Sequence, residues 1–199
     1  MNIIWHGHSC FEITGKDGTI VFDPYQANSV PGLNSLKLKA NLVLCSHEHD
    51  DHNARNCVEV APKDFKVACI ETYHDHHQGS HRGKNTIHIV DFEDLKVVHM
   101  GDIGCMMDDV SKLKNCDILM IPIGGYYTID TKEALKYIER IQPRIVIPMH
   151  YRSHEFGYDV LSTNEGFIQK SSNIVYVDDY LEVHKETKGQ TIVFKKPRN

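Results

Sequence analysis

Residues 46–52 constrain this chain more than any other segment. They place three histidines and three acidic residues directly after the apolar run 42–45. In an extended backbone, side chains two positions apart point the same way, so His47 and His49 can reach one metal ion together. In a helix the same two side chains would diverge. The pattern therefore predicts a strand that ends in a metal-binding loop.

The second half of this segment extends the prediction to a second ion. Asp51 and His52 lie where the chain must turn, beside the first pair. Imidazole with carboxylate ligands suits zinc, and also iron or manganese. The plainer interpretation is a solvated acidic turn that contains histidines by chance. The spacing H-x-H-x-D-H immediately after a buried-type strand favours the metal site.

The composition indicates an ordinary globular chain. With 199 residues, 41% of them hydrophobic, a single domain over residues 1–199 can bury most of its unfolded surface. The net charge is −5 and the Lys and Arg residues are scattered, which excludes the basic patch of a nucleic-acid-binding protein. No C-x-x-C pair is present, and no apolar stretch approaches the ~20 residues that span a bilayer. We expect a cytoplasmic protein with a small-molecule substrate and neither nucleic-acid nor membrane partners; a homo-oligomer is left open.

Short apolar runs separated by turn signals predict a chain built mainly of strands. The expected strands are 2–5, 11–14, 19–22, 42–45, 66–70, 86–90, 96–99, 118–121, 144–147, 174–177, 180–184 and 191–194. The expected helices are 54–60, 106–113, 131–141 and 163–170. Residues 131–141 have the best helical spacing, with Asp130 or Thr131 as the N-cap.

Five of these apolar runs share one feature at their carboxyl ends. Each is followed by an acid or a histidine, namely Asp23, the segment 46–52, His74, Asp102 and His150. In layered α/β proteins, ligands bind outside the carboxyl ends of the strands, where several loops converge. We therefore expect these distant side chains to meet at one edge of a sheet.

Taken together, these residues resemble the metallo-β-lactamase superfamily. The match includes F-D-P at Asp23, H-x-H-x-D-H, the G-D step at Asp102 and P-M-H-Y around His150. The phrases at 5–11, 82–87 and 121–125 resemble a small branch of metal-dependent hydrolases that includes ascorbate-phosphate lactonase. The resemblance implies an α/β fold, a four-layer αββα sandwich, with two metal ions at one edge.

The resemblance also implies the metal ligands. Those of the first ion are His47, His49 and His74, those of the second are Asp51, His52 and His150, and Asp102 bridges the two. His76 is the alternative to His74, because several histidines follow within a few residues. We favour His74 because it comes soonest after the predicted strand.

This ligand set predicts a hydrolase. Two ions about 3.5–4 Å apart lower the pKa of a bridging water, so that hydroxide exists near neutral pH and attacks a carbonyl or phosphoryl centre. Asp51 is the predicted catalytic residue, which orients the nucleophile and assists proton transfer. We expect two divalent ions, zinc first and manganese or iron as alternatives, and a small soluble ester, lactone or phosphoester as substrate. The alternatives are a mononuclear-iron redox enzyme resembling persulfide dioxygenase, and a non-catalytic metal-binding domain of the same fold.

Four further features each have two interpretations. Asp23 either caps a turn or supports the ligand loop through hydrogen bonds, as the resemblance suggests. His8 is either a polar core residue, which we favour, or a ligand. Residues 124–127 form either a simple hairpin turn or an anion site with a tyrosine wall. Arg152 either binds a substrate anion or has an ordinary surface role.

Overall fold

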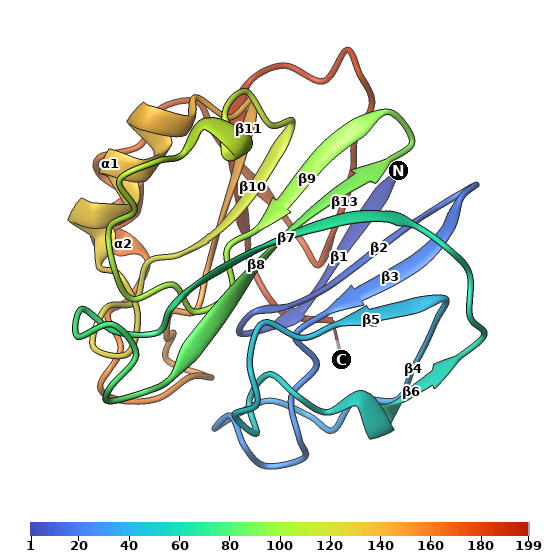
Figure 1. The fold of residues 1–199 in the computed structure, drawn as a ribbon, viewed down its shortest axis with the longest axis horizontal. Helices are drawn as coiled ribbons and strands as arrows, with labels where there is room; N and C mark the ends of the chain where they lie inside the picture. Colours follow the sequence, from blue (N-terminus) through green and yellow to red (C-terminus); the bar gives the residue numbers. More distant parts are fainter. Residues whose placement is uncertain (199) are drawn as a thin grey trace.

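The computed structural model describes residues 1–198, which form two packed β-sheets and a small strand pair (Figure 1). The five-stranded sheet has the order β13 (Tyr180–Glu182), β1 (Asn2–Gly7), β2 (Cys10–Gly15), β3 (Gly18–Phe22) and β5 (Leu42–Leu44). The seven-stranded sheet has the order β12 (Ile174–Val177), β14 (Gln190–Phe194), β11 (Ile145–Met149), β10 (Ile118–Pro122), β9 (Leu95–His99), β8 (Lys84–Phe92) and β7 (Lys66–Tyr73). The small pair is β4 (Leu38–Ala40) with β6 (Val58–Val60).

Strand directions explain why the predicted site residues lie together. β9, β10 and β11 are mutually parallel, and β7 runs the same way because two antiparallel pairings connect it to β9 through β8. In the other sheet, β3 is parallel to β5, and β1 has the same direction through β2. The loops after these strands therefore emerge at shared sheet edges.

The main core lies between the two sheets. Alternate residues of the five-stranded sheet, such as Phe11 and Phe22, point inward and are fully buried. All of β10 is buried, because one face of its sheet packs on the other sheet and the opposite face on helix α1 (Thr131–Ile141). This explains its continuous apolar sequence rather than an alternating one.

The two outer layers differ. On the seven-stranded sheet lie α1 and the short α2 (Glu165–Ile168), on the side away from the five-stranded sheet (Figure 1). The outward-facing side chains of Cys10 and Val21 are covered instead by residues of the 25–40 segment and by Val58. The predicted α/β sandwich is confirmed, with strands and loop in place of a long helix over the five-stranded sheet.

Every expected strand is present, with ends shifted by a few residues, and α1 has the predicted bounds. Asp130 is its N-cap: its carboxylate accepts the backbone N–H of Glu133 at 2.8 Å, and the Glu133 carboxylate accepts the N–H of Asp130 at 3.1 Å. The predicted N-terminus of α1 is therefore confirmed, with Asp130 as its cap.

Two helix predictions are wrong, and a third is too long. Residues 54–60 form the 3-10 turn η1 (Arg55–Cys57) and then β6, because the β-branched Val58 and Val60 pair with β4. In 106–113 only η2 (Ser111–Leu113) is helical, and Asp109 accepts the backbone N–H of Ser111 in a local turn that competes with a longer helix. The helix expected at 163–170 is reduced to α2.

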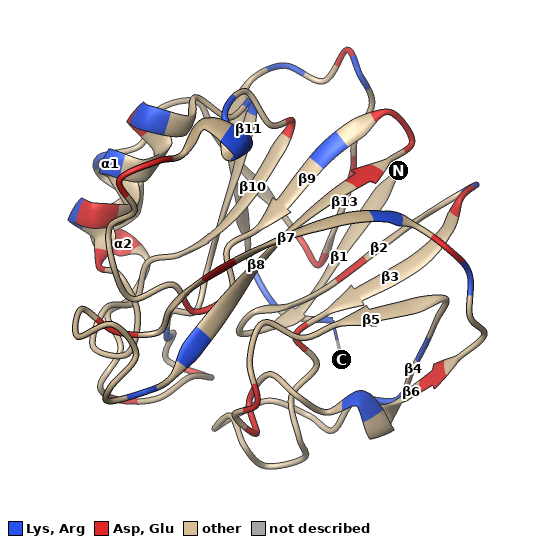
Figure 2. Ribbon diagram, in the orientation of Figure 1, with Lys and Arg blue, Asp and Glu red and all other residues tan. Residues whose placement is uncertain are grey.

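The surface of the described chain has a mixed charge. Figure 2 shows Lys and Arg interspersed with Asp and Glu along residues 1–198, without a region of one sign. The six cysteines are all free thiols. Among the described helices, none combines the length and apolar character needed to cross a membrane.

Candidate metal centre

The Asp102 carboxylate lies at the centre of the predicted ligands. Its Oδ2 is 3.0 Å from the Nε2 of His150, 3.2 Å from the Nε2 of both His52 and His74, and 4.0 Å from that of His47. These side chains come from the loops after β5, β7, β9 and β11. The structure therefore brings together residues more than 100 positions apart, as the strand-end pattern predicts.

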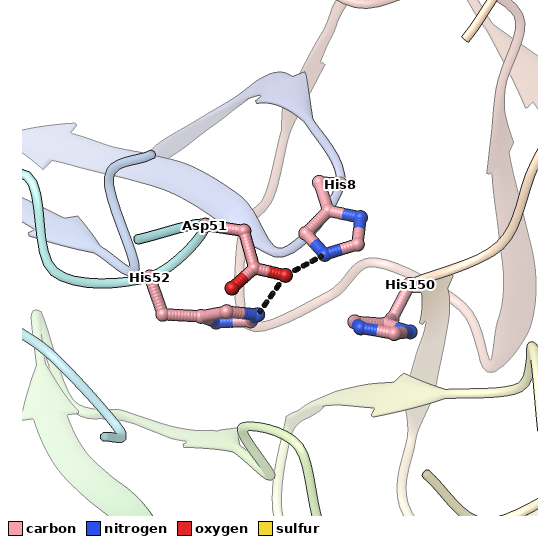
Figure 3. A group of neighbouring side chains, drawn as sticks. All are labelled: His8, Asp51, His52 and His150. Atoms are coloured by element: carbon pink, nitrogen blue, oxygen red, sulfur yellow. Dashed lines mark hydrogen bonds and ion pairs between the residues drawn. The ribbon is translucent and has the colours of Figure 1, made fainter. Parts of the chain in front are cut away.

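The side chains fall into two neighbouring groups, each with its ligand atoms within 4.8 Å of one another. One group consists of His47, His49 and His74. The other consists of His8, Asp51, His52 and His150, and Figure 3 shows these side chains facing a common space. A third set of the same kind, His47, His52 and Asp102, connects the two groups. The arrangement has room for an ion in each group, with Asp102 between them.

Several nitrogen and oxygen atoms at this centre are buried without a hydrogen-bond partner among residues 1–198. They are the Nε2 atoms of His47, His52 and His150, the Nδ1 atoms of His8 and His150, and the Oδ1 of Asp102. A buried polar atom without a partner costs about 1–3 kcal/mol, so such a concentration needs compensation. Lone pairs of imidazole and carboxylate that converge on one point are what a divalent ion requires. The donor set thus fits metal ions.

The structure brings His74, and not His76, into the cluster. His74 is buried and its Nδ1–H donates to the carbonyl of Tyr127 at 3.0 Å, which turns Nε2 toward Asp102. The side chain of His76 is 58% exposed and lies 3.6 Å from Glu133. The histidine that comes first after β7 is thus the one that lies in the cluster.

Asp23 supports the ligand loop, as the resemblance suggested. It is fully buried, and its carboxylate accepts the backbone N–H and the hydroxyl of Ser46 at 2.6 and 2.7 Å and the Nδ1–H of His52 at 2.8 Å. Burial alone would raise the pKa of Asp23, but His52 and His99 beside it lower the pKa below its usual range. The charged carboxylate therefore fixes the His52 tautomer that leaves Nε2 free for a ligand.

Asn85 positions Asp102, a role that the sequence pattern did not indicate. Its side-chain Oδ1 accepts the backbone N–H of Asp102 at 2.8 Å, and its Nδ2 donates to the Met100 carbonyl at 3.0 Å and to Thr72 Oγ1 at 2.9 Å. The residue is fully buried in β8. In the sequence, Asn85 lies within residues 82–87, one of the segments that carry the family resemblance, and this position could have indicated a role for it.

Asp51 has two partners that hold its orientation. Its Oδ2 lies 3.2 Å from the Nε2 of His8 and 3.3 Å from the hydroxyl of Tyr158 (Figure 3 shows the first). Burial and the nearby His150 lower the pKa of His8 to about 4, so the ring is neutral and Nε2–H donates to the carboxylate. His8 is buried and packs on His150 at a centroid distance of 4.1 Å, in agreement with the interpretation as a polar core residue.

Backbone conformations at this centre are strained. His8, Asp23 and His150 are non-glycine residues with φ of 52°, 43° and 52°, in the left-handed region. Such conformations cost of order 1–3 kcal/mol and persist where the surroundings impose them. Each of the three is the first residue after a strand, namely β1, β3 or β11. At these positions the chain must reverse while the side chain of the residue points into the cluster.

Gly104 allows the loop after β9 to approach the loop that carries His74. A Cβ atom on Gly104 would lie 2.4 Å from the backbone carbon of His74 and 2.6 Å from the backbone nitrogen of Asp75. The N–H of Gly104 donates to the carbonyl of Tyr73 at 2.9 Å, which holds the two loops together. Any side chain at this position must therefore displace the backbone of a predicted ligand.

We predict that Gly104→Ala lowers the free energy of unfolding by about 1–3 kcal/mol and weakens metal binding. Urea unfolding and zinc titration measure the two effects. Gly166→Ala is the matched control, since no atom lies within 4 Å of the added methyl group and alanine is favoured in a helix. Equal stability and zinc affinity in Gly104→Ala and the wild type would contradict this account of the loop contact.

Residues 124–127 and Arg152 each had two interpretations, and their contacts show which features are present. Gly124 and Gly125 form a turn, in which the N–H of Gly125 donates to the carbonyl of Ile129 at 3.2 Å, while Tyr127 lines the pocket above the cluster. The turn and the tyrosine wall are therefore both present. Arg152 donates from Nε to the carbonyl of Leu161 at 2.7 Å, which is a structural role.

Comparison with known proteins identifies the family. Residues 2–150 match the family model for the β-lactamase superfamily domain. A candidate zinc-dependent hydrolase of the metallo-β-lactamase superfamily from Thermotoga maritima superposes with a TM-score of 0.77, at 25% identity over 97% of both chains. The chain belongs to the metallo-β-lactamase superfamily.

Named relatives and a further solved structure are also similar to this chain. Relatives from Staphylothermus marinus and Thermoplasma acidophilum, both named UPF0173 metal-dependent hydrolases, are 32% and 29% identical over 74% and 78% of this chain. This chain covers 82% and 85% of their lengths. Igni18, a metallo hydrolase from Ignicoccus hospitalis, shares the fold with a TM-score of 0.62 at 20% identity and covers 85% of this chain and 89% of its own.

These relatives confirm the predicted enzyme class, a metal-dependent hydrolase, at the level of the family. The narrower resemblance to ascorbate-phosphate lactonase stays a prediction.

Proposed function

We propose that this chain hydrolyses a small ester, lactone or phosphoester at a dinuclear metal centre. The observation that supports the proposal is the convergence of side chains in two groups around Asp102, in which the Nε2 atoms of His47, His52 and His150 and the Oδ1 of Asp102 are buried without a hydrogen-bond partner among the described residues. In this proposal His47, His49 and His74 would hold one ion, Asp51, His52 and His150 would hold the other, and Asp102 would serve both. Zinc is the first choice, since it prefers imidazole and carboxylate ligands.

Divalent ions in such a site would lower the pKa of water and polarise the oxygen that gains charge in the reaction. The chain's own residues prepare the site for this chemistry. Asp23 keeps the proton of His52 on Nδ1, and the Tyr127 carbonyl does the same for His74. Asp51 is the proposed catalytic residue, because its carboxylate faces the pocket and is held by His8 and Tyr158.

A substrate screen tests this proposal. Zinc-loaded protein should hydrolyse at least one member of a panel of lactones, phosphodiesters and thioesters, and metal-free protein should hydrolyse none. Failure in all three classes with two ions bound would reject the hydrolase proposal. Oxygen consumption by iron-loaded protein would favour the mononuclear redox enzyme instead.

Metal retention is predicted to decrease with falling pH. In the metal-free chain, burial alone would lower the pKa values of His52 and His74, but Asp102 raises both above the usual value. Protons therefore compete for these two nitrogens from a higher pH than for an isolated histidine. Burial lowers the pKa of His47 to about 3, so this ring stays neutral and does not compete.

The measurement is metal content and hydrolysis after dialysis between pH 8 and pH 5. We expect both to fall together as the pH decreases, because a protonated imidazole cannot bind a metal. Full metal content at pH 5 with complete loss of activity would show that the acid limb has another cause.

A further inference from the structure

The proposed metal centre opens into a small pocket with one positively charged side chain. The pocket has a volume of about 250 Å³, enough for a small molecule. His49, His74 and Asp102 of the cluster line it, together with Tyr127 and Tyr158. Of the described residues that line the pocket, Arg82 is the one with a positively charged lysine or arginine side chain. The predicted set of site residues did not include it.

The loop that carries Arg82 is fixed by a single carboxylate. Asp75 is buried and accepts four backbone N–H groups, those of His77 at 2.7 Å, Gly79 at 3.0 Å, His81 at 3.1 Å and Arg82 at 2.8 Å. The backbone of Arg82 is therefore held in place within the loop between β7 and β8, which also carries His74.

Aromatic rings hold the Arg82 side chain in turn. Its guanidinium carbon lies 4.9 Å from the ring centre of Tyr127 and 5.8 Å from that of Tyr126, within range for cation–π interactions. This contact orients the guanidinium but satisfies none of its N–H groups, because a ring face replaces no hydrogen-bond acceptor in the guanidinium plane.

The other five arginines of the chain all have acceptors. Each donates to a carboxylate or a backbone carbonyl: Arg55 to Glu48, Arg140 to Met107, Arg144 to Asp117, Arg152 to Leu161 and Arg198 to Asp179. Within residues 1–198, the guanidinium of Arg82 has no hydrogen bond or ion pair of this kind and contacts the two tyrosine rings instead. An oriented guanidinium with free N–H groups beside a pocket is suited to bind an oxyanion through two parallel hydrogen bonds.

Charge balance at the loaded centre points the same way. Two divalent ions would carry four positive charges, and the carboxylates of Asp51 and Asp102 together with one hydroxide ion would neutralise three of them. Arg82 adds a further positive charge at the pocket. A neutral substrate would leave this charge uncompensated in a partly desolvated space, whereas an anionic substrate would neutralise it.

We propose that Arg82 binds a carboxylate or phosphate group of the substrate, so that the enzyme acts on small anionic esters or lactones. This inference rests on the proposed hydrolytic function, which supplies the reacting group at the metal centre. Arg82 then binds the oxyanion at one end of the substrate while the bond to be cleaved lies at the metal-bound end. Tyr127 contributes by orienting the guanidinium.

Binding of two simple anions tests the proposal without any requirement for turnover. Calorimetry of the zinc-loaded wild type with succinate and with inorganic phosphate measures the affinity for each source of the oxyanion. Arg82→Gln is expected to lose about ten- to hundredfold in affinity for succinate, for phosphate or for both, since it keeps a polar side chain but removes the charge and the paired donors of the guanidinium. The anion that is affected identifies the group that Arg82 recognises.

Lys84→Gln is the matched control. It removes one positive charge two residues away, from an exposed side chain that pairs with Glu71 at 3.1 Å, and should leave both affinities within about twofold of the wild type. Equal affinities of the wild type and Arg82→Gln for both anions, or no binding of either anion by the wild type, would overturn the proposal.

A pair of aryl esters separates this inference from the proposed function. One is an acetate ester, and the other is the succinate half-ester, which carries a free carboxylate. Arg82→Gln should lower kcat/KM for the half-ester by the factor lost in binding, and by a much smaller factor for the acetate ester, which offers Arg82 no oxyanion. An equal loss for both esters would contradict recognition of the anion, whereas no hydrolysis of either ester by the wild type counts against the hydrolase and leaves the binding test decisive for Arg82.

Discussion

Replacement of Asp102 by alanine is expected to abolish hydrolysis and to lower zinc affinity by more than about 100-fold. Loss of a group that merely orients a ligand typically costs 10- to 100-fold in affinity, and Asp102 is proposed to bind both ions directly. Its Oδ2 lies within 3.2 Å of three imidazole nitrogens, so no other side chain of the cluster occupies its position. Zinc content after dialysis and hydrolysis of the best substrate of the screen are the measurements.

Asp108→Ala controls for the loss of one acidic residue on the same loop. Asp108 is exposed, and its interaction with Arg140 uses the backbone carbonyl, which the substitution retains. The control should keep its zinc and its activity. Retention of two zinc ions by Asp102→Ala would show that Asp102 does not bridge them.

Replacement of Asp23 by alanine is expected to destabilise the fold by about 3–5 kcal/mol, the cost of leaving buried polar and charged groups without their partner. Three donors lose their acceptor: the N–H and hydroxyl of Ser46 and the Nδ1–H of His52. Urea unfolding measures this effect. Asp64→Ala, which removes an exposed acid, should leave the free energy of unfolding within about 0.5 kcal/mol of the wild type.

Asp23→Asn separates folding from metal binding. The amide oxygen can still accept the N–H of Ser46, which directs the amide NH2 group toward His52 Nδ1. His52 must then accept at Nδ1 and carry its proton on Nε2, where it blocks a metal ligand. We expect a folded protein with zinc affinity reduced about 10- to 100-fold. Zinc affinity equal to that of the wild type would contradict the role given to the Asp23–His52 bond.

The strands of this fold could be predicted because each is short, apolar and bounded by a turn signal. The wrong helix at 54–60 has a different origin. Local spacing allowed a helix there, but Val58 and Val60 belong to a parallel pair with β4, and contacts distant in sequence leave no local pattern. The same reason explains why β4 itself was not anticipated.

The cluster around Asp102 could be predicted because ligands follow the carboxyl ends of parallel strands, and sequence order alone distinguishes His74 from His76. The residues that support the cluster could not be predicted in this way. Asn85, Tyr158 and Arg82 act through a hydrogen bond or a ring contact across the fold, and residues of these types are also common on ordinary surfaces. Only the three-dimensional arrangement reveals that Arg82 has no acceptor among residues 1–198, whereas every other arginine has one.

Anomalous diffraction from crystals of the zinc-loaded protein tests the dinuclear centre most directly. The account predicts two zinc peaks, one among His47, His49 and His74 and the other among Asp51, His52 and His150, with the Asp102 carboxylate between them. A single peak, or zinc bound elsewhere, would contradict it.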